Sequence, residues 1–264
     1  MKYLVAFLIF AVAITASAHF GYPYLLGMTD DARLAIIESA IAKNSKSAPS
    51  EGASAAAVPS AACNYAQFTN YLAQFALEAG FDQSVNYTNN GDELVYEVNA
   101  LFKSLETSSD PTTAFDKFCV AQRQFFNLLD VDQIEGCINA PALVSWGYSD
   151  NQAVKTVQFF SQVNYQCTAG FRTYIGNFGG YLNAYAANIN VLNKCEDTFN
   201  ATLSTSPRDP CPAVDTYTTC VGSVYKNVSV DQAWTACEVV RKTNLVVFHE
   251  CRGVFLCQLA AFTS

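Results

Sequence analysis

Residues 110–129 read DPTTAFDKFCVAQRQFFNLL, and this stretch decides the fold class. Asp110 is a good helix N-cap, and Pro111 follows at the first helical position, where its missing N–H is harmless. Side chains that can face a protein core then recur every three or four residues, at Phe115, Phe118, Gln122, Phe126 and Leu129. That period is the period of one face of an α-helix. The stretch therefore predicts an amphipathic helix, and Cys119 lies within it.

The same helical spacing recurs along most of the chain. Gly80 follows one such segment and is a natural C-cap, while alternating patterns typical of strands are nearly absent. The sequence predicts an all-α, disulfide-stapled domain of about seven helices, preceded by a short helical leader. The predicted helices are 65–79, 94–105, 111–129, 157–171, 178–192, 211–220 and 232–262.

Ten cysteines lie in this helical region, and none lies near the N-terminus. An even number of cysteines in an exported chain predicts five disulfides and no free thiol. The sequence has no Cys-x-x-Cys motif and only two histidines, so it does not predict a zinc site or any other metal site or cofactor. The cysteines are Cys63, Cys119, Cys137, Cys167, Cys195, Cys211, Cys220, Cys237, Cys251 and Cys257.

The pairing of these cysteines stays open from sequence, with one geometric restriction. In a continuous helix over 232–262, Cys251 and Cys257 would lie about 9 Å apart along the axis. That exceeds the roughly 7 Å between Cα atoms that a disulfide can span. The two cysteines are therefore expected to bind different partners and to hold the last helix at two points.

The N-terminus has the pattern of a signal peptide. Lys2 provides a positive charge, residues 3–14 form a short apolar run, and Ala16-Ser17-Ala18 provides small residues for cleavage. The run is too short to span a bilayer comfortably. We expect residues 1–18 to be removed and the protein to be secreted into the extracellular space, without stable insertion in a membrane.

Two segments separate the signal peptide from the cysteines. Residues 19–44 form a leader in which Leu34, Ile37 and Ile41 predict one amphipathic helix. Residues 45–62 are rich in Ser, Ala and Pro and predict a flexible linker. The leader is a propeptide, a docking arm or a detached first helix of the main domain, and the sequence leaves these alternatives open. The cysteine-rich helical domain covers 63–264.

The composition restricts the classes of partner. The chain has a formal net charge of −8 and is 51% hydrophobic, so disorder of the whole chain is excluded and nucleic acid is not an expected partner. Three N-glycosylation sequons begin at Asn86, Asn200 and Asn227, each in a predicted loop or at a helix edge. The sequence therefore predicts a glycoprotein.

A weak internal echo adds a second organising pattern. Cys119-Val120 is followed by Val131-Asp132-Gln133 and Cys137, and Cys220-Val221 by Val230-Asp231-Gln232 and Cys237. The echo is interpreted either as a duplicated helix–turn–helix unit stapled at both ends or as chance.

These spacings, with Phe118-Cys119 and the aromatic helices between cysteines, resemble exported cysteine-rich domains of unknown function from nematodes. They also resemble the related core domain of nematode chondroitin proteoglycans, and residues 21–25 (GYPYL) look like the start of SXP-type nematode secreted antigens. Chondroitin attachment generally uses Ser-Gly, which this chain lacks. The resemblance implies an exported domain of unassigned activity and provides no catalytic residues.

Catalytic patterns have little support in the sequence, and we expect no enzymatic activity. His249 lacks the flanking residues of a secreted phospholipase, and no Gly-x-Ser-x-Gly accompanies it, so we expect a helical histidine at a core edge. His19 would become the N-terminus after cleavage, but a copper site in a flexible leader is not expected. Gly176 to Gly180 follow no strand and predict a bend between helices rather than a phosphate loop.

Two functions from different classes remain. The first is an extracellular structural or interaction protein that binds an unknown macromolecule. The second is a carrier of small hydrophobic ligands such as lipids, which would need an apolar pocket among Phe160, Phe178, Tyr185 and Phe248. A filled core would favour the first function, and surplus apolar volume the second.

Overall fold

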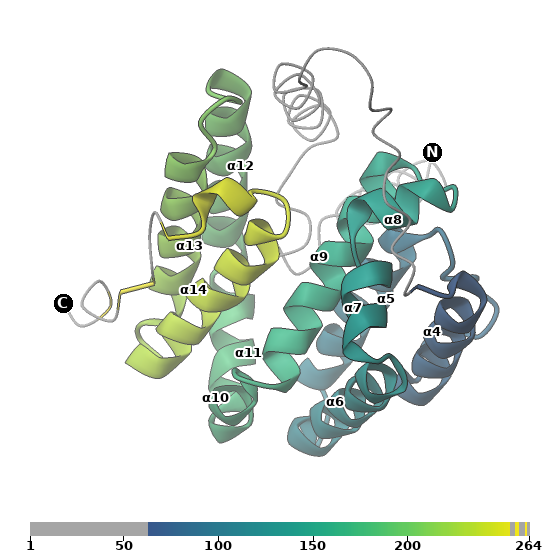
Figure 1. Cartoon of the computed structure of the whole chain (residues 1–264). Coiled ribbons are helices and arrows are strands. Elements are labelled where there is room, and N and C mark those ends of the chain that lie inside the picture. The colour runs from purple at the N-terminus through teal and green to yellow at the C-terminus, as the bar shows by residue number, and fades with distance from the viewer. Residues whose placement is uncertain (1–62, 254–256, 259–261, 263–264) are drawn as a thin grey trace, which may run out of the picture.

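The structure is a computed structural model that describes residues 63–253, 257, 258 and 262. In this part of the chain it contains eleven α-helices and no strand, which confirms the all-α prediction (Figure 1). The predicted signal peptide, leader helix and linker lie outside the described residues. The elements are α4 (Tyr65–Ala79), α5 (Gly91–Glu106), α6 (Pro111–Leu128), α7 (Val131–Cys137), α8 (Ala140–Ser145), α9 (Asp150–Cys167), α10 (Phe171–Gly176), α11 (Phe178–Ala187), α12 (Ile189–Thr205), α13 (Cys211–Tyr225), α14 (Val230–Leu245) and the 3-10 helix η1 (His249–Cys251).

The helix ends predicted from the sequence agree well with the structure. Asp110 caps α6 by accepting a hydrogen bond from the Thr113 backbone N–H at 3.1 Å, with Pro111 next in the chain. Gly80 ends α4 in the left-handed conformation, with φ of 80°. Asn177 separates α10 from α11, so the predicted bend at the glycines is confirmed.

The number of helices exceeds the prediction because short helices interrupt the connections. The helices α7, α8 and α10 have only six or seven residues each, too few for a periodic pattern to be recognised. The predicted helix 178–192 is divided at Asn188 into α11 and α12.

The described chain consists of two parts, each with its own disulfides. Residues 63–167, here the N-terminal half, contain two bridges, and residues 195–257, here the C-terminal half, contain three. All ten cysteines are paired, as predicted, and no bridge joins the two halves. Residues 168–194, with α10 and α11, form the link between them (Figure 1). The bridges are Cys63–Cys137, Cys119–Cys167, Cys195–Cys220, Cys211–Cys251 and Cys237–Cys257.

Phenylalanine rings fill the core of the N-terminal half. Phe75 of α4 has five ring neighbours at centroid distances between 5.6 and 6.2 Å. Phe125 of α6 stacks on Phe160 of α9 at 4.8 Å. The helix α9 lies at the centre, because it packs against α5, α6 and α8 on one side and α14 on the other. These contacts make the N-terminal half one continuous aromatic core.

The C-terminal half is an antiparallel helical unit of α12, α13 and α14, held by its bridges. Phe199 stacks on Tyr217 at 4.7 Å, and both rings are buried. The link contacts both halves, because Phe178 stacks on Phe115 at 5.1 Å while Tyr181 stacks on Tyr225 at 4.5 Å.

The internal echo is reproduced in the helix starts but not in the disulfides. Asp130 caps α7 and Ser229 caps α14, each accepting from the backbone N–H three residues later. The corresponding cysteines Cys119 and Cys220, however, are bonded to partners on opposite sides of them in the sequence. Cys119 pairs forward with Cys167, whereas Cys220 pairs backward with Cys195. The disulfide framework is therefore not duplicated.

Candidate functional site

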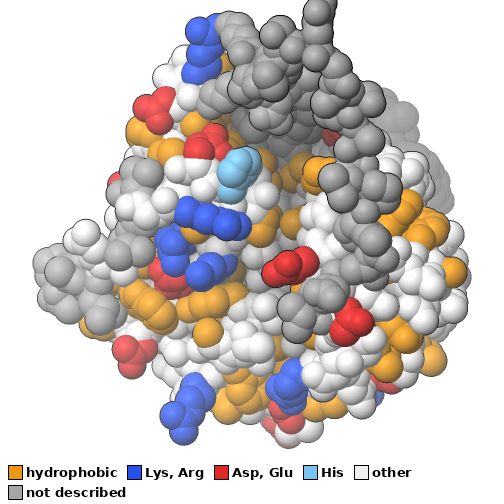
Figure 2. All heavy atoms as spheres, in the orientation of Figure 1, with side chains coloured by type: hydrophobic (Ala, Val, Ile, Leu, Met, Phe, Trp, Pro, Cys, Tyr) orange, Lys and Arg blue, Asp and Glu red, His pale blue; other side chains and the backbone are white. Residues whose placement is uncertain are grey.

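A cleft among the described residues lies at the C-terminal end of α14, where that helix meets α9. Its volume is about 490 Å³, within the usual range for ligand sites. We call it the basic cleft. Figure 2 shows Lys and Arg side chains gathered beside a histidine on one face of the molecule. The basic cleft is lined by Ser161 of α9, by Arg241, Lys242, Leu245 and Val246 of α14 and its C-cap, and by Arg252 and Gly253 after η1.

The basic cleft exists because α14 ends at Leu245 and the chain turns back. The prediction of one helix over 232–262 is therefore wrong. Gly253 has φ of 86°, a conformation that a continuing helix cannot contain. The Cα atoms of Cys237 and Cys257 are 5.9 Å apart, whereas 20 residues of helix would separate them by about 30 Å.

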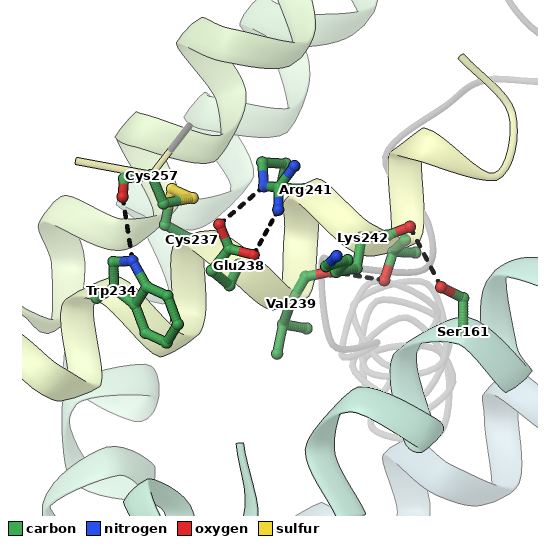
Figure 3. A network of polar contacts seen from close by, with 9 residues as sticks. Ser161, Trp234, Cys237, Glu238, Val239, Arg241, Lys242 and Cys257 are labelled. Carbon is green, nitrogen blue, oxygen red and sulfur yellow. Dashed lines mark hydrogen bonds and ion pairs between the residues drawn. A yellow bond between two sulfur atoms is a disulfide. The ribbon is translucent and has the colours of Figure 1, made fainter. Parts of the chain in front are cut away.

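Two disulfides hold the returning chain against the helices. Cys251 is bonded to Cys211 of α13, and Cys257 to Cys237 of α14. The Trp234 indole N–H also donates to the Cys257 carbonyl at 3.0 Å (Figure 3). The expectation that Cys251 and Cys257 bind different partners is confirmed. The two bridges fix the segment that contains Arg252 beside α14.

The three cations of the basic cleft have different electrostatic roles. Arg241 donates from Nε and Nη2 to the two carboxylate oxygens of Glu238, at 2.8 and 2.7 Å, and both side chains are buried (Figure 3). This pairing compensates the Arg241 charge. Lys242 and Arg252 are exposed, so they are the cations that can meet a ligand. The cleft therefore offers two exposed positive charges beside the apolar side chains of Leu245 and Val246.

Behind the cleft, α9 and α14 meet through polar side chains. On α9, Gln158, Ser161, Gln162 and Tyr165 share one face because they are three or four residues apart. Ser161 Oγ donates to the Lys242 carbonyl at 3.2 Å, which places this face against α14 (Figure 3).

On α14, Thr235, Glu238 and Arg241 recur every three residues. Burial raises the pKa of the Tyr165 phenol, the Glu238 charge raises it further, and the Arg241 charge lowers it. The helices α9 and α14 pack against each other. We call these two facing stripes the polar seam.

Four buried polar atoms of the polar seam have no hydrogen-bond partner within the described protein. They are Oε1 of Gln158, Oε1 of Gln162, the Tyr165 hydroxyl and Oγ1 of Thr235. Each would destabilise a dry interface by about 1–3 kcal/mol, and the net stability of a domain is only about 5–15 kcal/mol. Three further buried polar atoms of the described residues lack a partner, at Gln122, Tyr148 and Gln232, so the polar seam holds the larger share of them.

The four residues of the predicted apolar pocket do not surround one cavity. Phe160 and Phe178 are buried in ring contacts with Phe125 and Phe115. Phe248 is buried against Phe199 of the C-terminal half. Tyr185 of α11 is also buried, and its burial raises the pKa of its phenol. These side chains form parts of the core in different regions, so the structure does not bring them together as a ligand site.

His249 differs from the sequence expectation. It lies in η1 rather than in a long helix, and its side chain is 76% exposed rather than at a core edge. Its Nδ1 atom is 3.9 Å from a Glu250 carboxylate oxygen. In the described residues, no group of three or more His, Cys, Asp or Glu side chains is placed to hold a metal ion. His19 lies outside the described residues.

Two of the three sequons occupy exposed connections. Asn86 lies in the loop between α4 and α5, and Asn227 lies in the turn between α13 and α14. Asn200 is different, because it lies inside α12 and is only partly exposed. The expectation of a loop or helix edge is wrong for Asn200, because α12 continues to Thr205.

The cations of the basic cleft are the residues that the sequence analysis missed. A usable signal was present, because three of the 15 Lys and Arg residues of this acidic chain lie between 241 and 252. Their meaning was hidden because a continuous helix would have distributed them along one element. Only the reversal after Leu245 brings Arg252 into the same cleft as Lys242.

Comparisons with known proteins do not assign this site. The chain matches no protein-family model, no curated protein and no solved structure. No helix in the described part is both long and apolar enough to cross a membrane. The resemblance to nematode exported domains therefore stays a prediction, and the function must be argued from the basic cleft itself.

Proposed function

We propose that the chain is a secreted, disulfide-rich glycoprotein that acts as an extracellular interaction protein without catalytic activity. Its binding site is the basic cleft, and its partner is an acidic protein segment. The observation that carries this proposal is the pair of exposed cations, Lys242 and Arg252, beside Leu245 and Val246 in one concave surface. Five disulfides support the extracellular location, because such bridges persist in oxidising compartments.

The chemistry of the cleft favours an acidic segment that also carries apolar side chains. Carboxylates would pair with Lys242 and Arg252, while aliphatic side chains would contact Leu245 and Val246. A long polyanion such as nucleic acid is a poorer partner. Only two exposed cations line the cleft, and the net charge of −8 repels a polyanion elsewhere.

The alternative function, transport of a small hydrophobic ligand, has less support. It was tied to an apolar pocket among Phe160, Phe178, Tyr185 and Phe248, and the rings of the first two are occupied by core contacts. The described cleft has charged side chains at its surface and is lined by only two aliphatic residues. A lipid is therefore an outcome of the test below rather than the proposed ligand.

Glycans at Asn86 and Asn227 are compatible with this site. Both side chains are exposed in connections between helices, so an attached sugar would extend into solvent. Asn227 precedes α14, and Lys242 lies near the other end of that helix. The helix advances by twelve residues from Val230 to Lys242, which corresponds to about 18 Å, so a glycan at Asn227 leaves the basic cleft accessible.

The test is equilibrium binding of a fluorescein-labelled peptide of alternating glutamate and leucine, followed by anisotropy. We expect saturable binding that Lys242→Glu/Arg252→Glu weakens by about tenfold or more, because like charges then meet in the cleft. The matched control is Lys226→Glu, which reverses an exposed cation beyond the opposite end of α14 and should leave the affinity unchanged.

Three results would contradict the proposal. One is equal binding of a peptide of alternating lysine and leucine. Another is equal loss of affinity in the Lys226→Glu control. The third is saturable binding of a fluorescent fatty acid to ligand-free protein without binding of the acidic peptide, which would favour the carrier function instead.

A further inference from the structure

The polar seam is the surface on which the two bridged halves meet, and it leads directly into the basic cleft. Ser161 belongs to the N-terminal half and Lys242 to the C-terminal half, and both line the cleft. A change in the separation of α9 and α14 therefore changes the width of the cleft. No disulfide opposes such a change, because each bridge lies within one half.

Separation of α9 and α14 exposes groups that gain from contact with water. Gln158, Gln162, Tyr165 and Thr235 each hold an unpaired buried polar atom, and water would supply the missing hydrogen bonds. Opening the core around Phe75 would instead expose aromatic surface, which is unfavourable. The plane of easiest separation in the described chain is therefore the polar seam.

We infer that the polar seam is hydrated and opens in the native protein, and that a partner bound in the basic cleft closes it by bridging the two halves. The second part of this inference rests on the proposed function. An acidic segment in the cleft would contact Lys242 and Arg252 of the C-terminal half while lying against Ser161 of the N-terminal half. Such a ligand binds the closed arrangement better than the open one, so it shifts the population towards closure.

The experiment is rapid hydroxyl-radical footprinting of the intact, fully bridged protein, read at individual tyrosines by mass spectrometry. Tyr165 reports on the polar seam, Tyr217 reports on the closed core of the C-terminal half, and Tyr185 of α11 is the matched reference because it is 6% exposed and Tyr165 is 8% exposed. An open state populated towards the upper end of the range of about 0.1–10% should make Tyr165 several-fold more reactive than Tyr185. Equal reactivity of Tyr165 and Tyr185 would overturn the inference.

A seam variant tests the cause of the reactivity. Gln158→Leu/Thr235→Val removes two of the unpaired polar atoms and replaces the side chains with apolar ones of similar size, and neither residue lines the cleft. We expect Tyr165 reactivity to fall several-fold while Tyr217 stays protected. Unchanged Tyr165 reactivity in a folded variant would contradict the inference, and the wild-type comparison stands on its own if the variant does not fold.

The glutamate–leucine peptide separates failure of this inference from failure of the proposed function. Saturating peptide should reduce Tyr165 reactivity in the wild type and leave it unchanged in Lys242→Glu/Arg252→Glu. Peptide binding with a Tyr165 that is always protected would overturn seam opening alone. A reactive Tyr165 without peptide binding would overturn the proposed partner and the closure by it, and would support seam opening.

Discussion

The N-terminal and C-terminal halves use different side chains and different covalent support. Of the ten phenylalanines that are at most 1% exposed, eight lie in the N-terminal half, while Phe199 and Phe248 lie in the C-terminal half; the four tyrosines that are at most 1% exposed lie in the link and the C-terminal half. The N-terminal half has two disulfides for its 105 residues (63–167), and the C-terminal half has three for its 63 (195–257). The larger N-terminal half is thus stabilised mainly by packed aromatic rings, and the smaller C-terminal half depends more on disulfides.

The comparison teaches where binding can occur in a protein of this type. Interlocked phenylalanines fill the core of the N-terminal half. The smaller, bridged half ends in a chain reversal that presents cations, and its contact with the other half is polar. The candidate site therefore lies at the junction of the two halves rather than within either core.

The largest effect is expected from removing the central ring of the N-terminal half. Phe75→Ala should lower the free energy of unfolding by about 3–5 kcal/mol, because it empties a site surrounded by five rings. Denaturant unfolding measures the change. Leu77→Ala on the same helix is the control, since Leu77 is 61% exposed and should change stability by less than about 0.5 kcal/mol. Similar losses in both variants would contradict the ring-based account.

A somewhat smaller effect is expected from removing one bridge of the C-terminal half. Cys211→Ala/Cys251→Ala opens a loop of 40 residues, which should lower the free energy of unfolding by about 4 kcal/mol. It should also release Arg252 and weaken binding of the acidic peptide. The matched variant Cys63→Ala/Cys137→Ala removes a bridge of the N-terminal half and should keep peptide binding. If both variants kept full affinity for the peptide, the Cys211–Cys251 bridge would not be needed to hold Arg252 in the basic cleft, and this prediction would be wrong.

A smaller effect is expected from alkali, which acts on tyrosine but not on phenylalanine. Burial raises the pKa of Tyr174 to about 12 and raises the pKa of Tyr217 well above its usual value. Between pH 10 and 12 the unfolded state therefore binds fewer protons, and stability falls as the pH rises. Tyr174 alone contributes a loss of about 3 kcal/mol once the pH passes its folded pKa.

The alkaline prediction is measured by tyrosinate absorbance together with helical circular dichroism. We expect helicity to be lost as the pH rises above about 10, and Tyr174→Phe to move the transition to higher pH. Titration of all 14 tyrosines near pH 10 with unchanged helicity would contradict the burial of these rings.

The sequence predicted what depends on neighbouring residues. Helix starts such as Asp110-Pro111, the C-cap at Gly80 and the oxidised state of the cysteines follow from local chemistry or from composition, and the structure agrees with each. Disulfide pairing could not be predicted, because it depends on which helices become neighbours. Cys237 and Cys257, for example, meet only because the chain reverses after Leu245.

The candidate site was hidden from the sequence for the same reason. Its lining comes from α9, the end of α14 and the segment after η1, and no local pattern links Ser161 with Arg252. The polar seam was also unpredicted, because glutamines spaced by four residues on α9 look like an ordinary solvated helix face. Their burial follows only from the packing of α14 against them.

The central claim is that two separately bridged halves are joined by one stretch of chain and meet at the polar seam. The most direct test inserts a specific protease site at Asn188, between α11 and α12, and analyses the cleaved protein by denaturing electrophoresis without reductant. Two separate fragments are expected, one containing Cys63 to Cys167 and the other Cys195 to Cys257. A single band that separates only after reduction would show a disulfide between the halves and would rule out separate bridging.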